Sequence, residues 1–270
     1  MKQITNKTQF DFGENWVQFT ERALTREKVK QAKNDFIRLT SGINLDNIYF
    51  LDVGFGQGLS LLIAKQLGCK VLGCEINPKC IISLNKTMMH FPSIKTKEIP
   101  IVLGSILEKR ILTKLKKRSE QGYGIVHSWG VLHHTGNMKL AIENVSSLVQ
   151  KNGYLILAIY NKHWSSPMWK IIKKIYGGSP FVIKKTIIYL LYPFILVAKI
   201  IVLRKNPFEK NRGMDFYYDT IDWIGGYPYE YASVEEISNL VNTFGFKLIR
   251  IIHTQVPTGC NQYVFQKGNT

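Results

Sequence analysis

The stretch that most constrains this chain runs from Phe50 to Gly58, where a short apolar run is followed by three alternate glycines. Ile48 to Val53 is typical of a buried strand, and Leu59 to Leu67 is typical of the start of a helix. The glycines therefore lie in a strand-to-helix turn. Glycine lets such a turn approach a ligand closely, and the free amides of the helix N-terminus point into the same space. Open α/β sheets bind nucleotides at turns of this kind.

A second strand, Lys70 to Glu75, ends in a carboxylate at the position from which such folds bind both hydroxyls of a ribose. The glycine spacing is Gly-x-Gly-x-Gly, and Leu59 occupies the place where a dinucleotide-binding turn needs a small residue. A nucleoside with a non-phosphate tail therefore fits better than NAD. The alternative is an ordinary glycine-rich turn beside an exposed glutamate.

Together with Glu75, the segment Leu51 to Gly58 resembles the cofactor site of class I S-adenosylmethionine-dependent methyltransferases. The resemblance implies that S-adenosylmethionine is the cofactor and that the end of the third strand, Ile99 to Ser105, contacts its adenine. Most members carry an acid near that point, whereas here none occurs before Glu108. The cofactor-binding residues that we predict are Asp52, Gly54, Gly56, Gly58, Glu75, Ser105, Ile106, Ser128 and Trp129.

The fourth strand, Gly124 to Trp129, leads into Gly130 to Asn137, which should face the same crevice because ligands collect at the carboxyl ends of the strands. This segment is similar to the post-strand motif of small-molecule methyltransferases. We predict that His133 is the catalytic general base, since a neutral imidazole can accept a hydroxyl proton near pH 7. The alternative is that His133 only packs under the cofactor. Consecutive histidines point apart and no carboxylate or cysteine accompanies them, so no metal site is predicted.

The order of elements predicts an α/β fold built on a Rossmann-like, seven-stranded sheet with an antiparallel last strand, as in the resembling family. Four regions follow from this pattern. They are a helical arm at 1–47, a cofactor-binding core at 48–161, a helical insertion with an aromatic loop at 162–232, and a C-terminal helix and strand pair at 233–270. The insertion lies between the fifth strand and the last helix. The arm has aromatic residues at helical spacing and would cap the sheet rather than close over the cofactor edge.

The insertion carries most of the chain's charge. The formal net charge is +17, and Lys162 to Arg212 contributes +10, from eleven Lys and Arg against one acid, which indicates an anionic partner. Within it, Thr186 to Leu203 is nearly all apolar, but Pro193 and Lys199 count against a membrane span. Two interpretations remain open, a helical lid or a peripheral contact of 184–205 with anionic lipid. No RNA-binding module is recognisable, which argues against nucleic acid.

A second unusual stretch, Arg212 to Tyr231, combines aromatic residues with aspartates and glycines, a composition suited to a binding loop and poor for a regular element. We predict that the part from Asp215 to Tyr231 closes over the methyl acceptor. The alternative is a surface loop anchored by its tyrosines. The predicted substrate residues are His134, Tyr160, Asn161, Tyr217, Tyr218 and Glu230.

The resemblance covers Phe50 to Tyr160 and, in outline, Val234 to Phe265. More narrowly, the chain is similar to bacterial methyltransferases of the ubiquinone-biosynthesis O-methyltransferase type. This resemblance implies transfer of a methyl group to an oxygen, or less readily a nitrogen, of a small or lipid-linked acceptor. RNA methylation and non-catalytic S-adenosylmethionine binding are the alternatives. The cysteines lack paired metal spacing and the N-terminus lacks a signal, so we expect a cytoplasmic protein. The lipid-contact interpretation of 184–205 would place it peripherally at the inner face of the membrane. The sequence assigns no oligomeric state.

Overall fold

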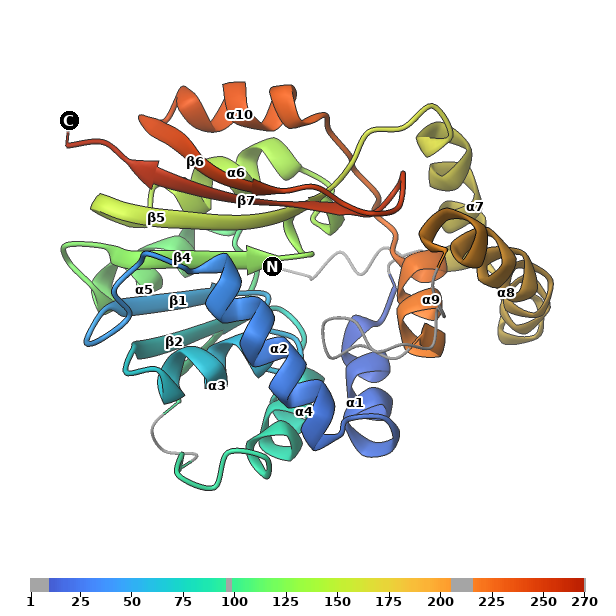
Figure 1. The fold of residues 1–270 in the computed structure, drawn as a ribbon, viewed down its shortest axis with the longest axis horizontal. Coiled ribbons are helices and arrows are strands. Elements are labelled where there is room, and N and C mark those ends of the chain that lie inside the picture. The colour runs from blue at the N-terminus through green and yellow to red at the C-terminus, as the bar shows by residue number, and fades with distance from the viewer. Residues whose placement is uncertain (1–9, 96–98, 205–215, 270) are drawn as a thin grey trace.

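The computed structural model describes residues 10–95, 99–204 and 216–269 (Figure 1). Seven strands form one sheet in the order β3-β2-β1-β4-β5-β7-β6. The first five strands are parallel, and β7 runs antiparallel to both of its neighbours. The strands are β1 (Tyr49–Val53), β2 (Lys70–Glu75), β3 (Ile101–Leu103), β4 (Tyr123–Trp129), β5 (Val149–Tyr160), β6 (Phe246–Ile252) and β7 (Cys260–Lys267). The predicted α/β sheet with an antiparallel last strand is confirmed.

Helices cover both faces of the sheet, because side chains along a strand point alternately to the two sides. On β1, Phe50 packs into the core under α2, α3 and α4, whereas Leu51 and Val53 pack into the core under α5, α6 and α10. The covering helices are α2 (Arg26–Leu39), α3 (Leu59–Gln66), α4 (Lys79–Met88), α5 (Lys109–Arg118), α6 (Met138–Ser146) and α10 (Val234–Asn242). Buried on both faces, the parallel strands present their carboxyl ends at one shared edge.

The helical insertion follows β5 as predicted, with α7 (Ser166–Gly178), α8 (Phe181–Leu203) and α9 (Phe216–Gly225). In Figure 1 these three helices lie together with α1 (Phe12–Arg22) beyond the carboxyl ends of the parallel strands. α9 contacts each of the other three, so the group forms one wall next to that edge of the sheet.

The prediction of a loop over Asp215 to Tyr231 is wrong for its first half, which forms α9. Phe216, Thr220 and Ile224 are buried and stand one helical turn apart, so they give this helix an inward face. The aspartates and tyrosines between them conceal that spacing in the sequence. Asp215 itself, with the rest of 205–215, lies outside the described residues.

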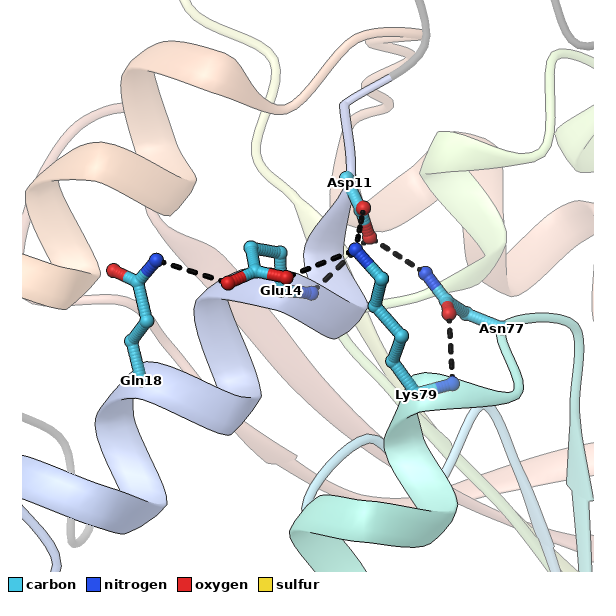
Figure 2. Close-up of polar contacts among 5 residues, drawn as sticks. All are labelled: Asp11, Glu14, Gln18, Asn77 and Lys79. Carbon is cyan, nitrogen blue, oxygen red and sulfur yellow. Dashed lines mark hydrogen bonds and ion pairs between the residues drawn. The ribbon is translucent and has the colours of Figure 1, made fainter.

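The two helices of the N-terminal arm do different things. α2 caps the sheet as predicted, since Phe36 and Leu39 join the core beneath it. α1 does not cap the sheet, because it stands against α4 at the edge where the strands end. Figure 2 shows the contact, in which Lys79 Nζ lies 2.8 Å from an oxygen of Asp11 and 2.9 Å from an oxygen of Glu14. Exposed ion pairs of this kind contribute about 0–1 kcal/mol each, so together they hold α1 in place only modestly.

Candidate active site

A cleft of about 1180 Å³ opens at the carboxyl ends of the parallel strands. Pockets that hold one small molecule typically measure roughly 300–1,000 Å³, so this cleft has room for two. One half is lined by the glycine turn after β1 and the end of β2. The other half is lined by the end of β5 and by residues of α8 and α9, and α1 borders both.

The glycine turn presents bare backbone to the cleft. Gly54 and Gly56 have φ angles of 76° and 55°, in the left-handed region that favours glycine. A Cβ atom on Gly54 would lie 2.5 Å from Val131, and one on Gly56 would lie 2.8 Å from Nε1 of Trp16. Gly58 does not line the cleft, since it begins α3 and a Cβ there would collide with Leu84 of α4.

Glu75 is fixed at the end of β2 by three backbone amides. Its Oε2 accepts a hydrogen bond from Gly56 N (3.0 Å), and its Oε1 accepts from Ile76 N (2.8 Å) and Asn77 N (3.1 Å). Burial raises the pKa of Glu75, and the three amide donors oppose that shift. Each carboxylate oxygen can accept more than one hydrogen bond, so Glu75 can still accept from a ligand in the cleft.

The glycine turn also holds a residue that the sequence analysis did not select. Gln57 is 6% exposed and lines the cleft, and its Oε1 has no hydrogen-bond partner among the described residues. A buried acceptor without a partner costs free energy unless a ligand or water satisfies it. Gln57 is therefore a candidate ligand contact. The sequence analysis missed it because it stands between two glycines of the motif, where the motif specifies no residue type.

Asp52 and His127 form a buried pair, with Asp52 Oδ1 2.8 Å from His127 Nδ1, and both line the cleft. They are register partners on the neighbouring parallel strands β1 and β4. Ser128 is not brought to the cleft, because it is fully buried and its Oγ donates to the carbonyl of Val53 (2.9 Å). Trp129 does line the cleft, and its Nε1 donates to Gln262 Oε1 (3.3 Å).

The predicted adenine residues also reach the cleft. Ser105 and Ile106 lie just after β3 and line the side next to Glu75. The Oγ of Ser105 accepts from Leu107 N (3.2 Å), which holds the turn after β3 in shape. Ile106 is 4% exposed and offers an apolar surface.

The histidine pair lies in a short 3-10 helix (Leu132–His134) after β4 and lines the cleft. His133 is fully buried, Tyr160 N lies 3.4 Å from its Nδ1, and its Nε2 has no partner within the described part of the chain. Burial lowers the pKa of His133 well below its usual range. His134 Nδ1 lies 2.6 Å from the carbonyl oxygen of Pro228, to which it donates, and burial lowers the pKa of His134 to about 3. Both rings are therefore neutral near pH 7.

The remaining predicted substrate residues divide into two groups. Tyr160 and Tyr217 line the cleft. Asn161, Tyr218 and Glu230 do not, and each has a structural contact instead. Asn161 Nδ2 donates to Pro257 O (2.9 Å), and Tyr218 packs on Phe19 with ring centroids 5.9 Å apart. Glu230 Oε2 accepts from Met138 N (3.0 Å) at the start of α6, where a carboxylate is stabilised by the helix dipole.

Three further polar residues gather on the insertion side of the cleft. Asp222 of α9 lines the cleft and accepts a hydrogen bond from Asn15 of α1. Lys173 of α7 is fully buried among aromatic rings directly behind that wall. Their sequence signal was weak, since an aspartate in an aromatic stretch and a lysine in a basic insertion both resemble surface residues. Over the described residues, no group of three His, Cys, Asp or Glu side chains could hold a metal ion.

Taken together, the fold and the cleft define a class I S-adenosylmethionine-dependent methyltransferase. The chain belongs to the methyltransferase domain family, whose model matches residues 25–251. Its cofactor is S-adenosylmethionine. The residues present fit that group, because the glycine turn leaves no Cβ in the way, Glu75 offers free acceptor capacity for a ribose, and Gln57 offers an unpartnered oxygen.

The relatives described below share little sequence identity with this chain. The chain is 23% identical over 150 residues to the ubiquinone biosynthesis O-methyltransferase of Pelagibacter ubique (strain HTCC1062), a match that covers 56% of this chain and 55% of that protein. The chain thus spans about half the length of the curated relative it matches. Among solved structures, magnesium protoporphyrin IX methyltransferase from Synechocystis PCC 6803 with bound SAH superposes with a TM-score of 0.52 at 15% identity, covering 96% of this chain and 89% of that one. A putative sarcosine dimethylglycine methyltransferase from Galdieria sulphuraria superposes with a TM-score of 0.53 at 10% identity, covering 90% and 85%.

Proposed function

We propose that this protein transfers a methyl group to a hydroxyl oxygen of a small acceptor, and that the acceptor is carried on a lipid. The observation that carries the proposal is the two-part cleft, in which the half lined by the glycine turn and Glu75 adjoins an aromatic half walled by an exposed apolar helix. The name of the curated relative, a ubiquinone biosynthesis O-methyltransferase, favours oxygen over nitrogen as the acceptor atom.

The two halves divide the work. Bound S-adenosylmethionine supplies an electrophilic methyl group. Glu75 would hold the ribose hydroxyls of the cofactor, Gly54 and Gly56 would lie along its methionine end, and Ser105 and Ile106 would enclose its adenine. Tyr160 and Tyr217 contact the acceptor, and α1 and α9 keep water from the reacting atoms. Fixing two reactants in line removes much of the entropic cost of their encounter.

His133 remains our candidate for contact with the reacting oxygen, but its surroundings favour a role as donor. Because the amide of Tyr160 points at Nδ1, the neutral ring carries its proton on Nε2, which faces no acceptor within the described chain. A buried N–H of this kind can hydrogen-bond the acceptor oxygen and orient it. A ring whose Nε2 already carries a proton is poorly placed to remove one.

The lipid-linked acceptor is supported by α8. Its segment Phe181–Val202 has a mean hydropathy of 1.9 and none of it is buried. Tyr189, Phe194 and Ile201 are 81%, 65% and 69% exposed, a cost in water that a membrane surface would remove. The same helix contributes Tyr192 and Lys199 to the cleft lining. A lipid tail lying along α8 would therefore bring its head group to the site.

Contact at the membrane surface agrees better with the packing of α8 than a span does. By length and composition Phe181–Val202 could cross a membrane. However, Lys199 Nζ lies 3.3 Å from Asp219 Oδ2, and the rings of Tyr192 and Phe216 are 5.3 Å apart, so one side of α8 is held on α9. The cationic residues Lys184, Lys185 and Arg204 at its two ends suit anionic head groups. We therefore propose a cytoplasmic protein that associates peripherally with the inner face of the membrane.

The test supplies the purified protein with methyl-labelled S-adenosylmethionine and three fractions of one cell lysate, namely membrane lipid, aqueous small molecules and total RNA. We expect label in the lipid fraction with the wild type and at least ten-fold less with Glu75→Ala. Label confined to the aqueous fraction would replace the lipid with a free small molecule. Label in RNA alone would overturn the proposed function.

A further inference from the structure

Asp222 lies on α9 and lines the same half of the cleft as Tyr160, His134 and Trp223. It forms no ion pair with any described residue, although the basic segment Lys162 to Arg212 lies just before it in the chain. Aspartates that serve the fold usually cap a helix or pair with a cation at the surface. Asp222 does neither, because it stands near the end of its helix and faces the cleft.

The carboxylate is held in one orientation by α1, which packs against α9. Asn15 of α1, which is 7% exposed, donates from Nδ2 to Asp222 Oδ1 at 2.7 Å. The backbone carbonyl of Asp222 accepts from Gly226 N at 2.8 Å, which fixes the last turn of α9. A side chain locked by packing and hydrogen bonding is what precise chemistry at a site requires.

A buried lysine lies behind this wall. Lys173 Nζ has no hydrogen-bond partner in the described structure and instead faces the rings of Trp223 (4.6 Å), Tyr229 (4.7 Å) and Tyr160 (5.6 Å). Burial lowers the pKa of Lys173 to about 7, and the nearby charge of Asp222 opposes that shift. Burial likewise raises the pKa of Asp222 to about 7, opposed by the hydrogen bond from Asn15 and by the charge of Lys173. A base whose pKa is near the working pH is the most effective proton acceptor.

We propose that Asp222 is the general base of the methyl transfer. The charge of Lys173, on the other side of the rings of Tyr160 and Trp223, adjusts the basicity of Asp222. The inference rests on the proposed function, because it needs an acceptor that carries a hydroxyl. As the acceptor oxygen forms its bond to the methyl carbon, the electron pair of the broken carbon–sulfur bond stays on sulfur. The hydroxyl proton passes to the free oxygen of Asp222 and then to solvent, so charge and atoms balance.

The groups that surround Asp222 determine what the pH profile should look like. Asp219 on the same helix raises the pKa of Asp222 and Lys173 lowers it. Asn15 from α1 is neutral. The other titratable groups near this position are Tyr160 of β5, Cys80 of α4, His134 after β4, and Lys199 of α8, which pairs with Asp219.

The first experiment measures transfer of labelled methyl into the membrane lipid fraction. Asp222→Asn keeps the shape and the bond from Asn15 but cannot take a proton, so we expect turnover to fall about 100-fold or more with S-adenosylmethionine affinity unchanged. A loss confined to KM, with kcat retained, would make Asp222 a binding residue and overturn the inference. If the wild type methylates nothing, the proposed function fails instead, which is a different result.

The second experiment uses two variants that should move the pH profile in opposite directions. Asp219→Asn removes a like charge, so the rise of activity with pH should shift downward. Lys173→Met removes an opposite charge, so the rise should shift upward. A merely structural role would lower activity without moving the profile. Unmoved profiles in both variants would overturn the inference even if Asp222→Asn failed to fold.

Discussion

The carboxylate of Glu75 and the amide of Gly56 are joined by a hydrogen bond of 3.0 Å, which ties the end of β2 to the glycine turn after β1. The acidic residue and the glycine motif are therefore one unit rather than two neighbouring contacts. A ligand that binds Glu75 also stabilises the shape of the turn, and a variant of either residue disturbs both.

Replacement of Glu75 by alanine should weaken S-adenosylmethionine binding by about 1.5–3 kcal/mol, because a charged acceptor of hydrogen bonds is lost. Isothermal titration calorimetry measures the change directly. Glu143→Ala removes the same charge from an exposed position on α6 and should leave the affinity unaltered. Equal affinities for the two variants would remove Glu75 from the cofactor site.

Gly56→Ala should abolish detectable cofactor binding, whereas Gly42→Ala should not. Both glycines have positive φ, at 55° and 79°, so both substitutions strain the backbone by about 1–2 kcal/mol. A Cβ at Gly42 meets nothing within 4 Å, while one at Gly56 meets Trp16 at 2.8 Å. The pair separates backbone strain from obstruction of the site, and similar affinities in the two variants would show that the close approach is unimportant.

His133→Gln and His133→Leu should differ if His133 acts as a donor. A glutamine amide can place an N–H near the position of Nε2, and leucine cannot. We expect His133→Leu to lose about 100-fold to 1,000-fold in turnover and His133→Gln to recover part of that loss. Equal, severe losses in both variants would instead support our sequence prediction of a general base.

Phe194→Glu should abolish flotation of the protein with liposomes of anionic phospholipid at low salt. The side chain is 65% exposed on α8, so its replacement puts a charge on the proposed membrane face without disturbing the fold. Ile37→Glu is the matched control, since Ile37 is 45% exposed on α2, away from that face. If the wild type stays with the protein fraction at the bottom of the gradient, α8 is a lid and not a membrane contact.

The contact between α1 and α4 should loosen in acid. Burial raises the pKa of Asp11, but its bonds to Lys79, Glu14 N and Asn77 outweigh this and lower it overall, and the bond to Lys79 lowers the pKa of Glu14. A carboxylate whose pKa is lower in the folded state stabilises the fold fully above its usual pKa, which is 3.8 for Asp11 and 4.5 for Glu14. That stabilisation is lost as the pH falls through the lower pKa of the folded state. Hydrogen exchange of α1 amides at pH 3 and pH 6, corrected for the intrinsic pH dependence of exchange, should show the difference. Lys79→Met should reduce it, since Asp11 keeps its bonds to Glu14 N and Asn77.

The sequence was sufficient for the sheet and for the glycine turn at its edge. Short apolar runs predicted β1, β2 and β4, and the glycine spacing predicted the turn after β1. The positive φ angles of Gly54 and Gly56 confirm that this turn needs glycine. The third strand is Ile101–Leu103 and is shorter than predicted, since Pro100 has no N–H to donate to the ladder.

The acceptor half was harder to predict because it depends on contacts between distant parts of the chain. Asp222 reaches its place through Asn15, which is 207 positions away, and neither residue belongs to a motif. The sequence predicts Glu230 as a substrate residue, whereas in the fold it binds the amide of Met138 at the start of α6. Lys173 looked like one of many solvated lysines, and only packing shows that it is surrounded by three rings.

Helix α1 contacts both halves of the cleft through two neighbouring residues. Trp16 lies beside Gly56, and Asn15 binds Asp222. A rigid helix cannot withdraw one of these side chains and leave the other in place. Any displacement of α1 that lets spent cofactor leave therefore also releases the carboxylate beside the acceptor. If cofactor exchange requires α1 to move, the same movement breaks the hydrogen bond from Asn15 to Asp222.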